Sequence, residues 1–172
     1  KTYCSSCKRQ VQIDTVSHIV DAVLTLPEGT KFLVTFPITV SQKVSSQNQI
    51  NLLKERGLVR ILVDGNIVDI TSETKDIDIL SAQSVSGIVD RLVVKDVIKE
   101  RLVDALETSY RLGSGHLSIL YNIQEPSVNT GARIKGNPIA IQDSQWVELK
   151  YSKHFFCSYC KIEYPEPVPA LF

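Results

Sequence analysis

The chain has 172 residues, and its 19 lysines and arginines are balanced by 19 aspartates and glutamates. A net charge of zero argues against a domain that binds nucleic acid or an anionic membrane through its net charge. A chain of this length forms one domain that buries roughly 70% of its unfolded surface without disulfide staples. No apolar run approaches the roughly 20 residues that cross a bilayer, and nothing resembles a signal peptide, so we expect a soluble, cytoplasmic protein.

The two ends of the sequence indicate a piece of a longer polypeptide. The chain contains no methionine and begins Lys1-Thr2-Tyr3-Cys4, although reading frames start with methionine. Pro165, Pro167 and Pro169 predict an extended tail. We interpret this tail as a connector into further sequence.

The N-terminal part predicts a helix followed by a strand. Apolar residues recur at helical spacing over residues 16–24, after the N-cap candidate Thr15, and Pro27-Glu28-Gly29 ends the pattern. Residues 31–40 are β-branched and aromatic enough for a strand. Pro37 confines the second half of that strand to an edge or a bend.

The next segments predict a short helix and a hairpin. Residues 48–56 carry an apolar stripe that stops at Gly57, a residue type that closes helices. Two β runs, 58–63 and 66–70, then flank the turn pair Asp64-Gly65. An Asp-Gly pair between two such runs is a strong local signal for a β-hairpin.

The middle of the chain predicts a strand at 85–94 and a long helix after it. We expect Asp96 to cap this helix, Glu107 and Arg111 to form a pair four residues apart, and Gly113 to end it. Further strands are expected at 116–123, 139–141 and 146–150. The fold class is therefore α+β, a small mixed sheet with two or three packed helices.

The four cysteines form two pairs at the extremes of the chain. Cys4 and Cys7 are two residues apart, as are Cys157 and Cys160, and 149 residues separate the pairs. Two such pairs supply the four thiolates that a structural zinc ion accepts, with no position left open for catalysis. Because loop-closure entropy rises only logarithmically with length, one zinc can join the two chain ends across the whole intervening domain.

Two other interpretations of the cysteines stay open. They could form redox pairs or disulfides, although neither pair has the strand-to-helix setting of a thioredoxin-like motif. We find no enzyme elsewhere in the sequence, because there is no phosphate-binding loop and no carboxylate couple. His18, His116 and His154 have no partners at ligand spacing.

Arg60 and Arg91 are the candidate partner-binding residues. Each interrupts a run of strand-forming apolar residues. Alternation places each arginine between two apolar neighbours on one face, Leu58 and Leu62 or Val89 and Val93. This pattern suits a protein-binding patch, since arginine is enriched at interface hot spots, but it also suits the guarded edge of a sheet.

Several motifs together resemble the UvrA family, the A subunits of bacterial excinucleases. They are, in chain order, Cys4-x-x-Cys7, Leu26-Pro27-Glu28-Gly29, Gly57-Leu58-Val59-Arg60, Val63-Asp64-Gly65, Val89-Asp90-Arg91, Arg101-Leu102, Phe155-Phe156-Cys157-x-x-Cys160 and Glu166-Pro167. The resemblance covers nearly the whole chain. The sequence departs from the family at Ser41–Gln49, at Ser81–Gly87 and at Ala170, where glycine-, lysine- and arginine-containing motifs are usual.

The resemblance implies a domain organisation and a function. Residues 1–7 and 157–172 would belong to an ATP-binding domain and carry the two halves of its zinc site, and residues 8–156 would be an inserted domain that binds UvrB. Arg60 and Arg91 fall on arginines that the family uses against acidic groups of UvrB. The bacterial parent protein would be a homodimeric repair ATPase that binds ATP and DNA through other domains and contacts no membrane.

A rival interpretation from a different class is a zinc-stapled nucleic-acid-binding module whose basic residues gather on one face. It predicts submicromolar DNA affinity that falls steeply with salt.

We expect the purified chain to contain one zinc per molecule, because four thiolates fill the coordination shell. Elemental analysis after gel filtration, combined with thiol titration before and after chelation, measures this directly. A metal-free chain with thiols that titrate near neutral pH would favour the redox interpretation instead.

Overall fold

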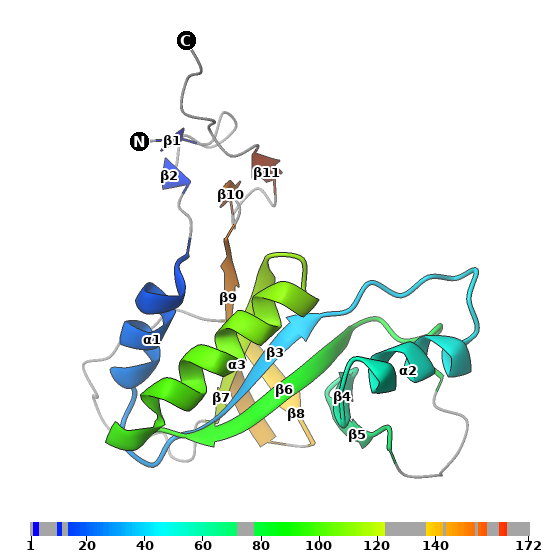
Figure 1. Ribbon diagram of the computed structural model, residues 1–172, viewed down its shortest axis with the longest axis horizontal. Helices are drawn as coiled ribbons and strands as arrows, with labels where there is room; N and C mark the ends of the chain where they lie inside the picture. The colour runs from blue at the N-terminus through cyan, green and yellow to red at the C-terminus, as the bar shows by residue number, and fades with distance from the viewer. Residues whose placement is uncertain are drawn as a thin grey trace.

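The computed structural model describes residues 14–71, 78–122, 137–142 and 144–153, together with the backbone of four short strands nearer the ends (Figure 1). The helices are α1 (Val16–Leu24), α2 (Ser46–Glu55) and α3 (Lys99–Leu112), and a 3-10 turn, η1 (Asp96–Ile98), precedes α3. The main strands are β3 (Lys31–Pro37), β4 (Arg60–Val63), β5 (Asn66–Asp69), β6 (Val85–Val93), β7 (His116–Asn122), β8 (Asn137–Ile141) and β9 (Ser144–Ser152). The short strands are β1 (Thr2–Tyr3), β2 (Gln10–Val11), β10 (Phe155–Cys157) and β11 (Ile162–Tyr164).

The main strands form one seven-stranded sheet in the order β5-β4-β6-β3-β7-β9-β8. Every pairing in it is antiparallel, so the predicted α+β class is confirmed, but the sheet is larger than expected and not mixed. Hairpins join β4 to β5 and β8 to β9, and α3 carries the chain across β3 from β6 to β7. This crossover places β3 at the centre of the sheet.

The predicted α1 and β3 are confirmed. The Thr15 hydroxyl accepts a hydrogen bond from the His18 backbone N–H at 3.1 Å, as an N-cap should. β3 ends at Pro37, and its pairing with β7 stops at Thr35, while its pairing with β6 continues to Pro37. Proline has no backbone N–H to donate. Because β7 no longer pairs with β3 at Pro37, the proline removes no hydrogen bond on that side of the strand.

The second helix and the hairpin are also confirmed. α2 starts two residues earlier than the apolar stripe indicated, because the Ser45 hydroxyl caps it by accepting from the Asn48 N–H. Asp64 and Gly65 both have positive φ angles, of 47° and 82°. Two central residues with positive φ are the hallmark of a type I′ turn, which matches the twist of the flanking strands.

The start of α3 corrects the sequence prediction. Asp96 does not cap the long helix, because residues Asp96–Ile98 form the separate 3-10 turn and α3 starts at Lys99 without a side-chain cap. Glu107 and Arg111 are both exposed on α3, and no ion pair forms between them. Gly113 does end the helix, as predicted.

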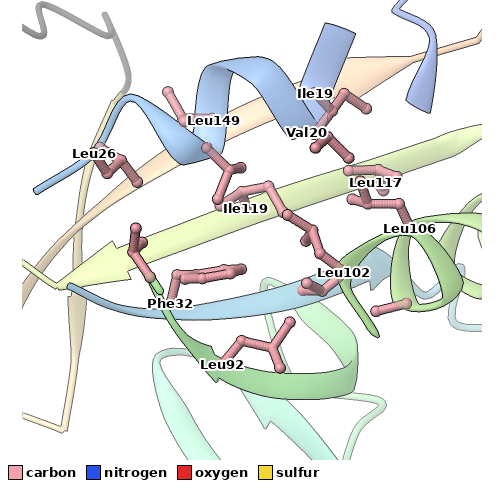
Figure 2. Close-up of a cluster of buried hydrophobic side chains, with 14 of the residues drawn as sticks. Ile19, Val20, Leu26, Phe32, Leu92, Leu102, Leu106, Leu117, Ile119 and Leu149 are labelled. Atoms are coloured by element: carbon pink, nitrogen blue, oxygen red, sulfur yellow. The ribbon is translucent and has the colours of Figure 1, made fainter. Parts of the chain in front are cut away.

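The largest hydrophobic core lies between the sheet and two helices. Figure 2 shows Phe32, Leu117 and Ile119 of the central strands facing Leu102 and Leu106 of α3. Ile19 and Val20 of α1 close the same layer, and all seven side chains are at most 2% exposed. A second core on this side joins α2 to Phe36 and the β4–β5 hairpin. Burial of these faces supplies most of the stabilisation of the helices.

The opposite face of the sheet is covered by the curl of the sheet itself. A third, smaller core on that face contains Leu33, Leu62, Ile88, Leu120 and Ile141. The two ends of the sheet meet there, since the Gln142 N–H beside β8 donates to the Gly65 carbonyl of the β4–β5 turn at 2.9 Å. A Cβ at Gly65 would lie 2.5 Å from the Ala140 carbonyl oxygen, so a glycine is needed for this close approach.

Asp14, which precedes α1, is hydrogen-bonded to the end of β9. Its N–H donates to the Ser152 carbonyl at 2.8 Å, and its carboxylate accepts from the Ser152 N–H at 3.1 Å. The Tyr110 hydroxyl of α3 donates to the Asp14 carbonyl at 2.6 Å. Burial raises the pKa of the Asp14 carboxyl, although the Ser152 hydrogen bond and nearby His18 oppose this. Burial also raises the pKa of Tyr151 to about 12.

We expect Asp14→Asn to become more stable relative to wild type as the pH rises. A raised folded-state pKa means that the folded protein favours protonated Asp14, so the wild type loses this contribution as pH rises through that pKa, whereas the amide stays neutral. Urea unfolding of both proteins from about pH 3 to about pH 7 measures the difference.

Asp21→Asn is the matched control, because Asp21 is an exposed aspartate on α1, the helix that Asp14 precedes. A difference between Asp14→Asn and wild type that is constant across this pH range would contradict the assignment.

Candidate partner-binding site

Arg60 and Arg91 line one hollow of about 380 Å³, although 30 residues lie between them in the sequence. The hollow lies among the start of β4, the middle of β6 and the exposed side of α3. Its wall is formed by Arg56, Gly57, Leu58, Val59, Arg60, Ile88, Val89, Asp90, Arg91, Arg101, Thr108 and Leu112. Among the described residues, the charged members of this wall are four arginines and one aspartate, which gives it a net positive charge.

Arg60 is held at the first residue of β4. It lies opposite Ile88 of β6 on one side and opposite Asp69 of β5 on the other. The Asp69 carboxylate accepts hydrogen bonds from the Thr71 N–H at 2.8 Å and the Thr71 hydroxyl at 2.6 Å. Across the described part of the chain, no ion pair is formed by the half-buried Arg60 side chain.

Arg91 follows an irregularity in the pairing of β6 with β3. Ile88 lies opposite Thr35 and Asp90 opposite Val34, so Val89 has no partner of its own on β3. Such a bulge re-aims the side chains that follow it. Arg91 then lies opposite Leu33, a member of the third core, and its exposed side chain has no ion pair with any described residue.

The predicted alternation fails on one side of each arginine. Leu58 precedes β4 and packs into the second core, on the helix side of the sheet, whereas Leu62 lies in the third core on the opposite face. Val89 likewise packs on the helix side, because the bulge breaks the period of two before Arg91. The two arginines therefore lie on the face of the third core, and Leu58 and Val89 do not flank them on that face.

Asp90 and Arg101 form a two-point ion pair beside these arginines. Arg101 donates from Nε to Oδ2 of Asp90 at 2.9 Å and from Nη2 to Oδ1 at 2.7 Å. The Asp90 side chain is 22% exposed and that of Arg101 is 65% exposed. These hydrogen bonds, followed by the charge of Asp90, raise the pKa of Arg101, so the guanidinium stays charged.

The sequence did not identify Arg56 or Arg101 as members of this site. Arg56 is the C-cap residue of α2 and immediately precedes the Gly57-to-Arg60 segment, so its closeness to Arg60 in sequence is a usable signal. Arg101 reaches the hollow only because α3 packs beside β6. No local pattern could reveal that contact.

The segments that carry the cysteine pairs leave the described domain side by side. Residue 14 is hydrogen-bonded to residue 152, and β2 contacts β10, which contains Cys157. Cys4, Cys7 and Cys160 lie outside the described residues, as does the side chain of Cys157. The predicted zinc site therefore stays a prediction, supported by four thiol donors at zinc-ligand spacing and by the neighbouring chain ends.

Among the described residues, no three histidines, cysteines or acidic residues are placed to hold a metal ion. In the same part of the chain, no helix is long and apolar enough to cross a membrane. His18 lies near Asp14, with its Nδ1 3.8 Å from a carboxylate oxygen.

Comparison with known proteins identifies a family. The family model described as the UvrA interaction domain matches residues 14–123. The chain is 30% identical over 170 residues to UvrABC system protein A of Clostridium perfringens, covering 99% of this chain and 16% of that protein. It is 31% identical over 170 residues to the protein of that name from Streptococcus pyogenes serotype M1, with 99% and 16% covered.

A third relative, UvrABC system protein A of Treponema pallidum, is 27% identical over 172 residues, with 100% of this chain and 17% of that protein covered. The chain thus spans about a sixth of the length of these curated relatives. The predicted resemblance to UvrA is confirmed over the whole chain.

We expect Arg101→Gln to change the thermal midpoint by no more than about 3 °C, because surface ion pairs contribute little to folding. Differential scanning calorimetry at low and high salt measures the shift. A larger loss of stability would mean that the pair with Asp90 supports the fold itself.

Proposed function

The chain belongs to the UvrA interaction domain family, and on that basis we propose that it binds UvrB and recruits it to DNA lesions during nucleotide excision repair. The observation that carries the proposal is the hollow where Arg60 and Arg91 meet. The two residues lie on β4 and β6, which β5 separates in the sequence, yet both line this one hollow. A protein partner with acidic side chains would satisfy both at once.

The chemistry of this hollow favours carboxylate groups on the partner. A guanidinium can bind a carboxylate through two parallel hydrogen bonds, which fixes orientation as well as adding energy. Arginines held at strand positions also lose less freedom on binding than they would in a loop. The exposed Val59 and the partly buried Val89 provide apolar surface beside the charges, a combination typical of interface hot spots.

The rest of the predicted organisation is proposed on the same basis. Residues 8–156 would form the UvrB-binding insertion, and residues 1–7 and 157–172 would return the chain to an ATP-binding domain of a homodimeric, DNA-binding parent. Cys4, Cys7, Cys157 and Cys160 would hold one structural zinc. That ion would join the two ends of the insertion, whose first and last described segments already hydrogen-bond to each other.

We expect Arg60→Glu and Arg91→Glu each to weaken UvrB binding at least about thirtyfold, equivalent to roughly 2 kcal/mol. Each change removes a donor to a carboxylate and places a like charge against it. Isothermal titration calorimetry of the 172-residue chain with UvrB of the source organism measures the affinity.

Arg111→Glu is the matched control, since Arg111 is an exposed arginine on α3 that does not line the hollow. Equal losses in all three variants would show a general charge effect and contradict the assignment. A parallel titration with duplex DNA tests the nucleic-acid alternative, which requires submicromolar affinity and a steep salt dependence.

A further inference from the structure

A second hollow, of about 360 Å³, is lined by α2, the end of β3 and the end of α3. It shares two wall residues with the first hollow, which Arg60 and Arg91 line. These are Arg56, the C-cap residue of α2, and Leu112, the last residue of α3. The two hollows are therefore neighbours on one surface, with Arg56 and Leu112 between them.

The charges around the second hollow favour an acidic ligand. Among the described residues that line it there is no aspartate or glutamate, and its ionisable members are Arg56 and the half-buried His116. The exposed Arg56 side chain forms no ion pair with any described residue. Its backbone is fixed, because the Arg56 N–H donates to the carbonyls of Leu52 and Leu53 at 3.2 Å each. This guanidinium can therefore bind the carboxylate of a partner.

Leu52 adds an apolar contact point to the same surface. Its side chain is 53% exposed, whereas Ile50 and Leu53 of the same helix are buried in the second core, so the fold gains little from a leucine at position 52. Val59, at 44% exposed, lies in the wall of the first hollow. Five large apolar side chains among the described residues are at least 36% exposed, and two of them thus line the hollows that Arg56 joins.

This composition fits a protein ligand better than a nucleic acid. A phosphate group would bind Arg56 but would gain nothing from exposed leucine and valine side chains. A protein segment can pair an acidic residue with Arg56 and cover Leu52 with an apolar one. An arginine beside apolar contacts is the composition of hot spots at protein interfaces.

We propose that the partner-binding surface extends from the first hollow across Arg56 into the second hollow, where it binds a segment of the partner that carries an acidic and an apolar side chain. The carboxylate pairs with Arg56, and the apolar side chain packs against Leu52. This inference rests on the proposed function, because it takes UvrB as the protein that supplies the segment. It adds α2 to the interface.

Isothermal titration calorimetry of the 172-residue chain with UvrB tests this extension. We expect Leu52→Ser and Arg56→Gln each to bind about fivefold to tenfold more weakly than wild type. At about 300 mM salt the loss in Arg56→Gln should shrink while that in Leu52→Ser persists, because salt screens charges but not apolar contacts. Leu52→Met should bind within about twofold of wild type, since it keeps the apolar surface.

The matched controls lie outside both hollows. Val97→Ser replaces an apolar side chain that is 87% exposed on η1, and Arg111→Gln removes an exposed arginine of α3. Both should bind UvrB within about twofold of wild type. Thermal midpoints of all the variants identify any loss of binding that comes from unfolding, which we do not expect at exposed positions.

The extension is overturned if either Leu52→Ser or Arg56→Gln binds UvrB as the wild type does, or if the controls lose as much affinity as these variants. With UvrB binding unchanged, a duplex-DNA affinity that falls in Arg56→Gln would assign the surface to nucleic acid. In the same case, a dimer that Leu52→Ser dissociates in sedimentation velocity would assign it to a second copy of the chain.

The failure of the extension is separable from the failure of the proposed function. If the wild-type chain does not bind UvrB, the proposed function fails. If Arg60→Glu and Arg91→Glu lose binding while Leu52→Ser and Arg56→Gln do not, only the extension fails.

Discussion

The burial of β3 on both faces is the constraint on which the rest of the structure depends. Its five residues Phe32–Phe36 are all buried, although successive side chains along a strand point to opposite sides of the sheet. Both faces of the sheet must therefore be covered. The helices cover one face, and the sheet curls to cover the other, with the Gly65 turn hydrogen-bonded to Gln142. The single strand thus contributes side chains to all three cores.

The pairing of β3 with β6 also sets the positions of the residues in the candidate site. β6 pairs with β3 over most of its length, and the irregularity between Val34 and Thr35 inserts Val89 without a partner. Because of this extra residue, Asp90 shares a face with Val34 and reaches Arg101 of α3, whereas Arg91 shares the opposite face with Leu33. β4 pairs with the earlier half of β6, and its first residue, Arg60, lies opposite Ile88, next to the bulge, in the wall of the same hollow. The cluster of positive charge is thus a product of strand register.

Local features of the fold could be predicted from the sequence, whereas features set by pairing could not. The cap at Thr15 and the Asp64-Gly65 turn depend on a few adjacent residues, and both are confirmed. The alternation around Arg91 is wrong because the bulge depends on β3, more than fifty residues earlier in the chain. The cap at Asp96 is wrong because a 3-10 turn intervenes before α3. The order of the seven antiparallel strands likewise depends on pairings between residues that are far apart in the sequence, which local patterns do not reveal.

The candidate site likewise has parts that the sequence predicts and parts that only the packing of the elements reveals. Arg60 and Arg91 could be singled out because a charge inside an apolar strand run is visible in the sequence, and the family resemblance sharpened their role. Their meeting in one hollow and the contribution of Arg101 follow from the packing of α3 beside β6, to which no spacing points. The two cysteine pairs are the reverse case. Their spacing is plain in the sequence, while three of the four cysteines lie outside the described residues.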